Sequence, residues 1–71
     1  MVMTLKQMLK SIESNELLAV KKELVRYGHV LELQDWISEK GAHRRYIIKY
    51  LHTVFVIAML NGETIGIKPQ L

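Results

Sequence analysis

The sequence predicts an α+β fold in which three or four short helices precede a C-terminal β-hairpin. Apolar residues recur at helical spacing between residues 5 and 37, whereas residues 53–68 are rich in β-branched and aromatic side chains. An Asn-Gly pair divides that later segment, as it does in tight hairpins. With 71 residues, 49% of them apolar, the chain has the size and composition of one small globular domain, residues 1–71.

Two amphipathic helices are expected first. Thr4 is a favourable N-cap, because its hydroxyl can accept a hydrogen bond from a free backbone N–H of the first turn. The first apolar stripe contains Leu5, Met8, Leu9 and Ile12. The second stripe contains Leu17, Val20, Leu24 and Tyr27. Gly28 is a natural residue to end the second helix, and one bent helix across both segments is an alternative.

The segment between Gly28 and residue 53 is less regular. Leu33, Trp36 and Ile37 have helical spacing and predict a short helix over residues 33–40, with Gly41 as its stop. Residues 43–51 allow two interpretations, because their bases suit a helix whereas their tyrosines and isoleucines suit a strand. The strand alternative gives helices packed on a three-stranded antiparallel meander.

Residues 53–68 predict the hairpin, with Asn61 and Gly62 in a type I′ turn that needs positive φ at both positions. A two-residue loop pairs Leu60 with Glu63, Ala58 with Ile65 and Val56 with Ile67. We expect this face to cover the core. The other face carries Phe55, Ile57 and Met59. That second apolar face then needs cover from a helix, another strand or another subunit.

Positive charge is concentrated in the C-terminal part of the chain. Residues 1–39 carry five bases and six acids, whereas residues 40–71 carry five bases and one acid. From Lys40 to Gly62 there is no acid at all. Such a stretch creates a positive potential that attracts polyanions. A solvated face with scattered bases is the alternative interpretation.

Residues 33–51, LQDWISEKGAHRRYIIKYL, resemble a helix-turn-helix. Gly41 stands at the position of the turn glycine, and Ala42 is the small residue that follows it. His43 occupies the place where Ser or Thr commonly caps the second helix, which is a departure from the pattern. With a helix before it and a hairpin after it, the segment is similar to the winged helix-turn-helix family over roughly residues 17–68.

The resemblance implies a small regulator of transcription whose second motif helix enters the major groove of duplex DNA. Arg44, Arg45 and Lys49 are then the candidates for base contacts, since Arg can pair bidentately with guanine. The residues expected near phosphates are Lys40, His43, Tyr46 and His52. A homodimer would match a palindromic site, and residues 1–14 could form its dimerisation helix.

A protein-binding adaptor or inhibitor is the second hypothesis. The apolar surface available to it, or to a homodimer, consists of Leu5, Met8, Leu9, Ile12, Phe55, Ile57 and Met59. Trp36 is expected in the core, with a place in an interface as the alternative. A helix at residues 43–51 would favour DNA readout, and a strand there would favour the adaptor.

No enzymatic activity, cofactor or metal is expected. Cysteine is absent, which removes thiolate zinc sites and cysteine nucleophiles. The histidines, at positions 29, 43 and 52, are not at metal-ligand spacing. Residues 51–62, the longest uncharged stretch, fall short of the about 20 residues that span a membrane. No signal peptide is expected either, so the predicted location is cytoplasmic.

Overall fold

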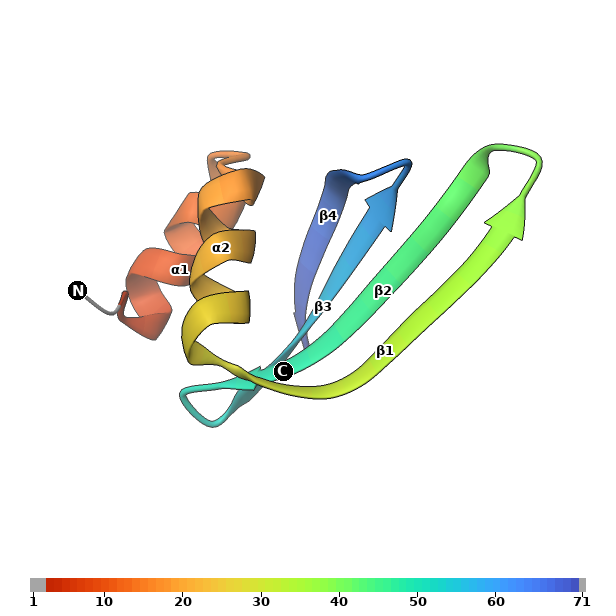
Figure 1. The fold of residues 1–71 in the computed structure, drawn as a ribbon. Coiled ribbons are helices and arrows are strands. Elements are labelled where there is room, and N and C mark those ends of the chain that lie inside the picture. Colours follow the sequence, from red (N-terminus) through yellow and green to blue (C-terminus); the bar gives the residue numbers. More distant parts are fainter. Residues whose placement is uncertain (1–2, 71) are drawn as a thin grey trace.

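The computed structural model describes residues 3–70, which form an α+β fold. Two helices come first, α1 (Leu5–Glu13) and α2 (Leu17–Tyr27). Four strands follow, β1 (His29–Ser38), β2 (Gly41–Tyr50), β3 (Thr53–Leu60) and β4 (Glu63–Gln70). They form one antiparallel sheet in the order β1-β2-β3-β4, so each strand pairs with its neighbour in the chain. Figure 1 shows both helices on one side of this sheet.

α1 begins with the N-cap that the sequence predicts. The Thr4 hydroxyl accepts a hydrogen bond from the Gln7 N–H, and the Gln7 side chain accepts one from the Thr4 N–H. Met8 is fully buried, and the rest of the apolar stripe, Leu5, Leu9 and Ile12, packs against the same core. The apolar stripe of the expected dimerisation segment, residues 1–14, therefore packs on the core of the same chain, and residues 1 and 2 lie outside the described part.

α1 and α2 are two separate helices, because Asn15 between them has a positive φ of 60°. α2 ends at Tyr27, as Gly28 predicts. Gly28 itself has an ordinary φ of −84°, but a side chain there would collide with Ile48 and with the carbonyl oxygen of Leu24. Close packing of the helix end against β2 thus explains this glycine.

The helices expected at residues 33–40 and 43–51 are wrong, because these segments form most of β1 and β2. The helical spacing at residues 33–37 covers only about one turn. Residues 43–50 are rich in strand-forming side chains, and as a strand they place Ile48 and Tyr50 in the core. Gly41, with a φ of 129°, follows the tight reversal at residues 39 and 40. Residues 33–51 are therefore a strand-turn-strand unit. The meander expected as the alternative comes closer, but the sheet has a fourth strand, β1.

The turn at Asn61 and Gly62 is confirmed, since both residues have positive φ. Leu60 also pairs with Glu63, as expected. Beyond that pair a β-bulge shifts the register of β4 by one residue. A shift of one residue moves each following side chain of the strand to the opposite face of the sheet. Ala58 consequently pairs with Gly66 instead of Ile65, and Val56 pairs with Lys68 instead of Ile67.

The core lies between the helices and one face of the sheet. Its buried residues are Met8, Val20, Leu24, Ile48, Tyr50, Phe55, Ile57, Met59 and Ile67. Phe55, Ile57 and Met59 are therefore covered from within the same chain, by helices, and not by another subunit. Their assignment to an interface is wrong for this fold, because an interface needs apolar side chains that are exposed in the free protein. The expectation that Val56 and Ala58 face the core is also wrong, because side chains alternate along β3 and these two lie on the opposite side from Phe55, Ile57 and Met59.

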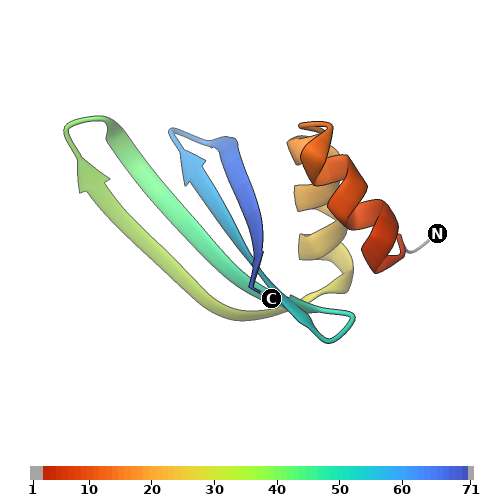
Figure 2. The same ribbon diagram turned by 180° about the vertical axis from the view of Figure 1, so that it is seen from behind.

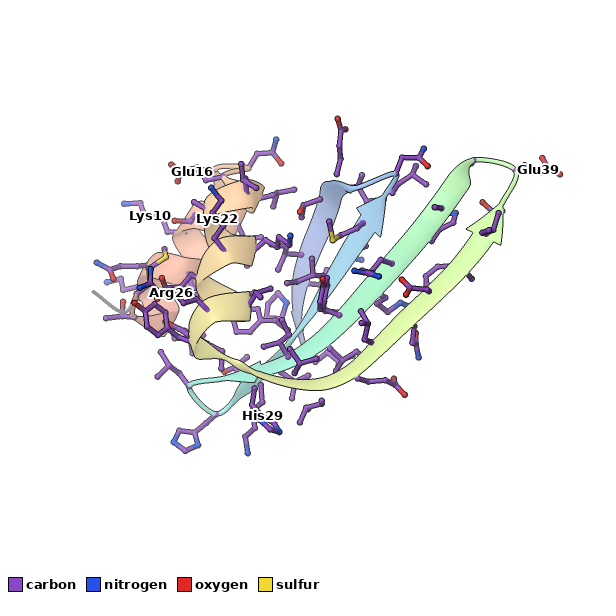
Figure 3. The ribbon with its side chains drawn as sticks, viewed as in Figure 1. Lys10, Glu16, Lys22, Arg26, His29 and Glu39 are labelled. Atoms are coloured by element: carbon purple, nitrogen blue, oxygen red, sulfur yellow. The ribbon has the colours of Figure 1, made fainter. Side chains whose placement is uncertain are left out.

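The helices cover only one end of the sheet. β1 and β2 extend beyond them, and Glu39 at the tip of the β1–β2 hairpin lies well away from both helices (Figures 1 and 3). Figure 2 shows the same separation from behind. Near this tip Ile37 is 84% exposed. Within residues 3–70, neither helix has the length and apolar character needed to cross a bilayer.

Candidate nucleic-acid interface

The basic segment expected to bind DNA lies in β2, where strand geometry divides its side chains between two faces. Successive residues of a strand point to opposite sides of the sheet. Ile48 and Tyr50 are buried beneath the helices, so the even-numbered residues Arg44 and Tyr46 share that helix side. The odd-numbered residues His43, Arg45 and Lys49 point away from the helices. The predicted set of seven residues therefore does not form one surface.

We call the side away from the helices the open face. It consists of four cross-strand rows, from the tip of the β1–β2 hairpin to the opposite end of the sheet: Trp36–His43–Leu60–Glu63, Gln34–Arg45–Ala58–Gly66, Glu32–Ile47–Val56–Lys68 and His29–Lys49–Val54–Gln70. Its middle is apolar and half-buried, with Ile47, Val54, Val56, Ala58 and Leu60. No described helix packs on it (Figures 1 and 2).

Three exposed cations stand on the open face, on two different strands. Arg45 and Lys49 come from β2, and Lys68 comes from β4. The two carboxylates of this face, Glu32 and Glu63, lie on the edge strands β1 and β4. The cations therefore lie around the apolar middle of the sheet, and the acids lie at its margins.

An aromatic stack forms the corner of the open face nearest the hairpin tip. The rings of Trp36 and His43 are parallel within 1°, with centroids 4.9 Å apart. The Arg45 guanidinium lies 5.2 Å from the centroid of the Trp36 ring, a cation–π distance. Ser38 positions the imidazole, because its hydroxyl oxygen is 2.5 Å from Nε2 of His43. A 41% exposed tryptophan is thus held in a fixed orientation, and its expected place in the core is wrong.

Arg44 is engaged on the other side of the sheet. Its Nε and one terminal nitrogen donate to the two carboxylate oxygens of Asp35, at 2.7 and 3.1 Å. These hydrogen bonds raise the pKa of Arg44 and lower the pKa of Asp35. The guanidinium also lies 5.9 Å from the ring of Tyr46. Arg44 therefore links β2 to β1 through Asp35, and neither Arg44 nor Tyr46 is part of the open face.

Lys40 and His52 are placed in turns at opposite ends of β2. Lys40 lies in the β1–β2 turn, where its carbonyl oxygen accepts a hydrogen bond from the Asn61 side chain. His52 lies in the β2–β3 turn with a φ of 64°. Of the seven predicted DNA-binding residues, the structure brings together only His43, Arg45 and Lys49 on the open face.

Lys68 and Gly66 are not expected on this surface from the sequence, and a surface position of Trp36 is expected only as the alternative to the core. Lys68 and Gly66 reach the open face because of the bulge in β4, which a pattern of alternating residues does not reveal. Trp36 could have been found, since a strand at residues 33–38 places it beside His43 and Arg45. A shallow hollow of about 340 Å³ lies among Arg45, Val56, Ala58, Gly66 and Lys68, with residues 69 and 70 at its end.

Within residues 3–70 no group of three His, Asp or Glu side chains is arranged to hold a metal ion. No protein-family model, curated protein or solved structure matches this chain.

Proposed function

We propose that this protein is a non-enzymatic nucleic-acid-binding protein and that the open face of the sheet is its binding surface. The observation that carries the proposal is the gathering of Arg45, Lys49 and Lys68 around an apolar centre, next to the Trp36–His43 stack. Within the described residues none of these three cations is held in a salt bridge. They are therefore available to an external polyanion.

The cations of the open face and its aromatic side chains both suit a nucleic acid. Lys and Arg side chains neutralise phosphates and release bound counterions, which supplies much of the affinity of such complexes. Aromatic side chains and Arg guanidinium planes provide surfaces on which bases stack. Contact through a sheet replaces the recognition helix expected from the sequence, because residues 43–51 form a strand.

Paired substitutions of equal charge test this proposal. Arg45→Ala with Lys49→Ala removes two cations from the open face, and Lys22→Ala with Arg26→Ala removes two from α2. Lys22 and Arg26 lie on the helix and away from the sheet (Figure 3). By fluorescence anisotropy with labelled oligonucleotides at low salt, we expect the open-face pair to lose about tenfold or more in affinity, near 1.4 kcal/mol.

The α2 pair should bind within about twofold of the unmodified chain, a difference of less than half a kcal/mol. Equal losses for the two pairs would show that net charge alone attracts the oligonucleotide, and the open face would then not be the site. Absence of binding to any oligonucleotide at low salt would overturn the proposed function.

A protein-binding role is the second candidate, and two observations favour it: residues 43–50 form a strand and not a helix, and β1 is exposed. β1 forms one edge of the sheet and exposes Val30, Leu31, Leu33, Trp36 and Ile37. The opposite edge, β4, is interrupted by a bulge and by Pro69, which has no N–H to donate. The regular part of β1, residues 32–38, is thus the edge suited to pairing with a strand of a second copy.

Sedimentation over a wide concentration range tests pairing between copies. Ile37→Lys should abolish dimers, because a lysine on an edge opposes strand addition. Ile65→Lys on the β4 edge is the matched control, since Ile65 is also exposed. A chain that stays monomeric at all concentrations would refute this second candidate, and so would equal effects of the two substitutions.

A further inference from the structure

The hollow on the open face has an apolar floor and a cationic rim. Val56, Ala58 and Gly66 form the floor, and Arg45 and Lys68 stand on either side of it. Ala58 and Gly66 are a directly paired row of β3 and β4, and they are the smallest residues of the face. The hollow exists because these two positions carry a methyl group and a hydrogen.

Gly66 is explained neither by positive φ nor by close packing. Gly41 and Gly62 have positive φ, and Gly28 is packed too closely to carry a side chain. Gly66 has no positive φ, and a Cβ placed on it would meet nothing within 4 Å. It stands beside the bulge of β4, where glycine is common in strands. Because it has no side chain, it leaves the floor of the hollow open.

Arg45 connects the hollow to the aromatic stack. The same guanidinium that borders the hollow lies 5.2 Å from the centroid of the Trp36 ring, which in turn stacks on His43. The stack thereby restrains a planar cation at the side of an apolar cavity. Planar, apolar groups with an adjacent negative charge match this combination.

We infer that the hollow receives one base of a single-stranded nucleic acid, which stacks against the Arg45 guanidinium while Lys68 contacts a neighbouring phosphate. This inference rests on the proposed function and adds a preference for single strands. In a duplex each base is paired as well as stacked, so a base can enter such a hollow from a duplex only after it is unpaired, which disfavours the duplex relative to a single strand. Free phosphate alone would not fill the apolar floor.

Filling the hollow without changing charge tests the inference. The probes are oligothymidylate of about 12 nucleotides, a length typical of single-strand sites, and its duplex with oligodeoxyadenylate. Gly66→Val should lower affinity for the single strand by about tenfold, within the range of one lost stacking contact. Its unfolding midpoint in urea should stay the same or rise, because valine favours a strand.

Two further variants separate the effect of filling the hollow from the effect of introducing a valine elsewhere in the sheet. Ala58→Val fills the same hollow from β3 and should weaken single-strand binding in the same way. Thr64→Val places the same valine on the helix side of β4, away from the open face, by replacing a hydroxyl with a methyl group, and should leave binding unchanged. The fluorescence of Trp36, the one tryptophan of the chain, should respond to the single strand in the unmodified protein.

Each outcome decides between the inference and the function on which it rests. If both hollow-filling variants bind the single strand as the unmodified chain does, the hollow is not a base site. If the unmodified chain binds duplex as tightly as single strand, the preference for single strands is wrong while the proposed function stands. If it binds neither probe, the proposed function is itself overturned.

Discussion

At the scale of single residues, the alternation of β2 separates two neighbouring arginines that look equivalent in sequence. Arg44 is paired bidentately with Asp35 on the helix side, whereas Arg45 is exposed on the open face. Arg44→Ala should therefore leave oligonucleotide affinity within about twofold, and Arg45→Ala should lower it several-fold. Anisotropy titrations of the two variants check this. Equal losses would mean that both arginines contact the ligand.

The Arg44–Asp35 pair should also contribute little to stability. Its two side chains are 46% and 56% exposed, and water and salt screen the attraction between exposed charges. The lowered pKa of Asp35 means that this small contribution is present above the ordinary pKa of an aspartate and is lost in acid.

Tyr50 should make stability sensitive to alkaline pH. Its buried hydroxyl lies 2.7 Å from the Met3 carbonyl oxygen and 2.9 Å from a Glu23 carboxylate oxygen. Burial, reinforced by Glu23, raises the pKa of Tyr50 from 10.0 to about 12. The folded chain thus favours the protonated phenol, and this stabilisation is complete below the unfolded pKa and lost as the pH rises toward the folded one.

Tyr50→Phe should remove that pH dependence. Between pH 10 and pH 12 the unmodified chain should lose about 2 kcal/mol of unfolding free energy that the variant does not lose. Urea unfolding at several alkaline pH values measures the difference. Parallel pH profiles for the two proteins would contradict the assignment.

The β2–β3 turn places two unsuitable residues at positive φ. Leu51 and His52 have φ values of 48° and 64°, which cost side chains of this kind about 1–2 kcal/mol per residue. Leu51→Asn together with His52→Gly should therefore raise the unfolding free energy by about 1–2 kcal/mol. Oligonucleotide affinity should not change, since the turn lies outside the open face. A loss of stability in urea unfolding would refute this account of the turn.

At the scale of elements, local signals predicted the parts of the fold that depend on local chemistry. The capping box at Thr4, the helix stop at Gly28 and the Asn61–Gly62 turn are all present. The sequence predicts a helix for residues 33–38 of β1, because Leu33, Trp36 and Ile37 match one helical turn. Its strand form depends on pairing with β2, a contact that residues 33–40 alone do not encode.

The open face could be predicted only in part for a related reason. His43, Arg45 and Lys49 follow from alternation once β2 is a strand, but the register of β4 depends on its bulge. A shift of one residue moves Lys68 and Gly66 from the core side to the open face. A bulge reflects the fit between two strands, so periodicity along either strand does not report it.

α1 should behave as a core helix and not as a dimer contact. Met8 is fully buried among residues of the sheet and α2. Met8→Ala should lower the unfolding free energy by about 2–4 kcal/mol, through lost burial and the cavity left behind. Urea unfolding at two protein concentrations measures this effect. A loss that vanishes at high concentration would indicate that α1 is instead buried between subunits.

At the scale of the whole molecule, the fold separates in space the basic residues that lie close together in the C-terminal half of the sequence. The basic half of the chain divides between the open face, the helix side and the turns, and leaves three cations on the open face. If Lys49 and Lys68 contact phosphates of a single strand while Arg45 stacks on a base, the logarithm of affinity should fall with the logarithm of salt concentration with a slope of about −1.4. Anisotropy at several salt concentrations measures it, and a slope near zero would exclude phosphate contacts.

The order of the sheet also dictates the order in which the molecule can assemble. Every strand pairs with the next one along the chain, so the meander closes only short loops, and such topologies form quickly. The helices make their most extensive sheet contacts with β4, the strand farthest from them in sequence, and smaller ones with β1 and β2. During synthesis the apolar stripes of α1 and α2 can therefore be covered completely only after residues 63–70 have left the ribosome. Their docking is the late step, and the interval before it is when the nascent chain is most exposed to chaperones and to aggregation.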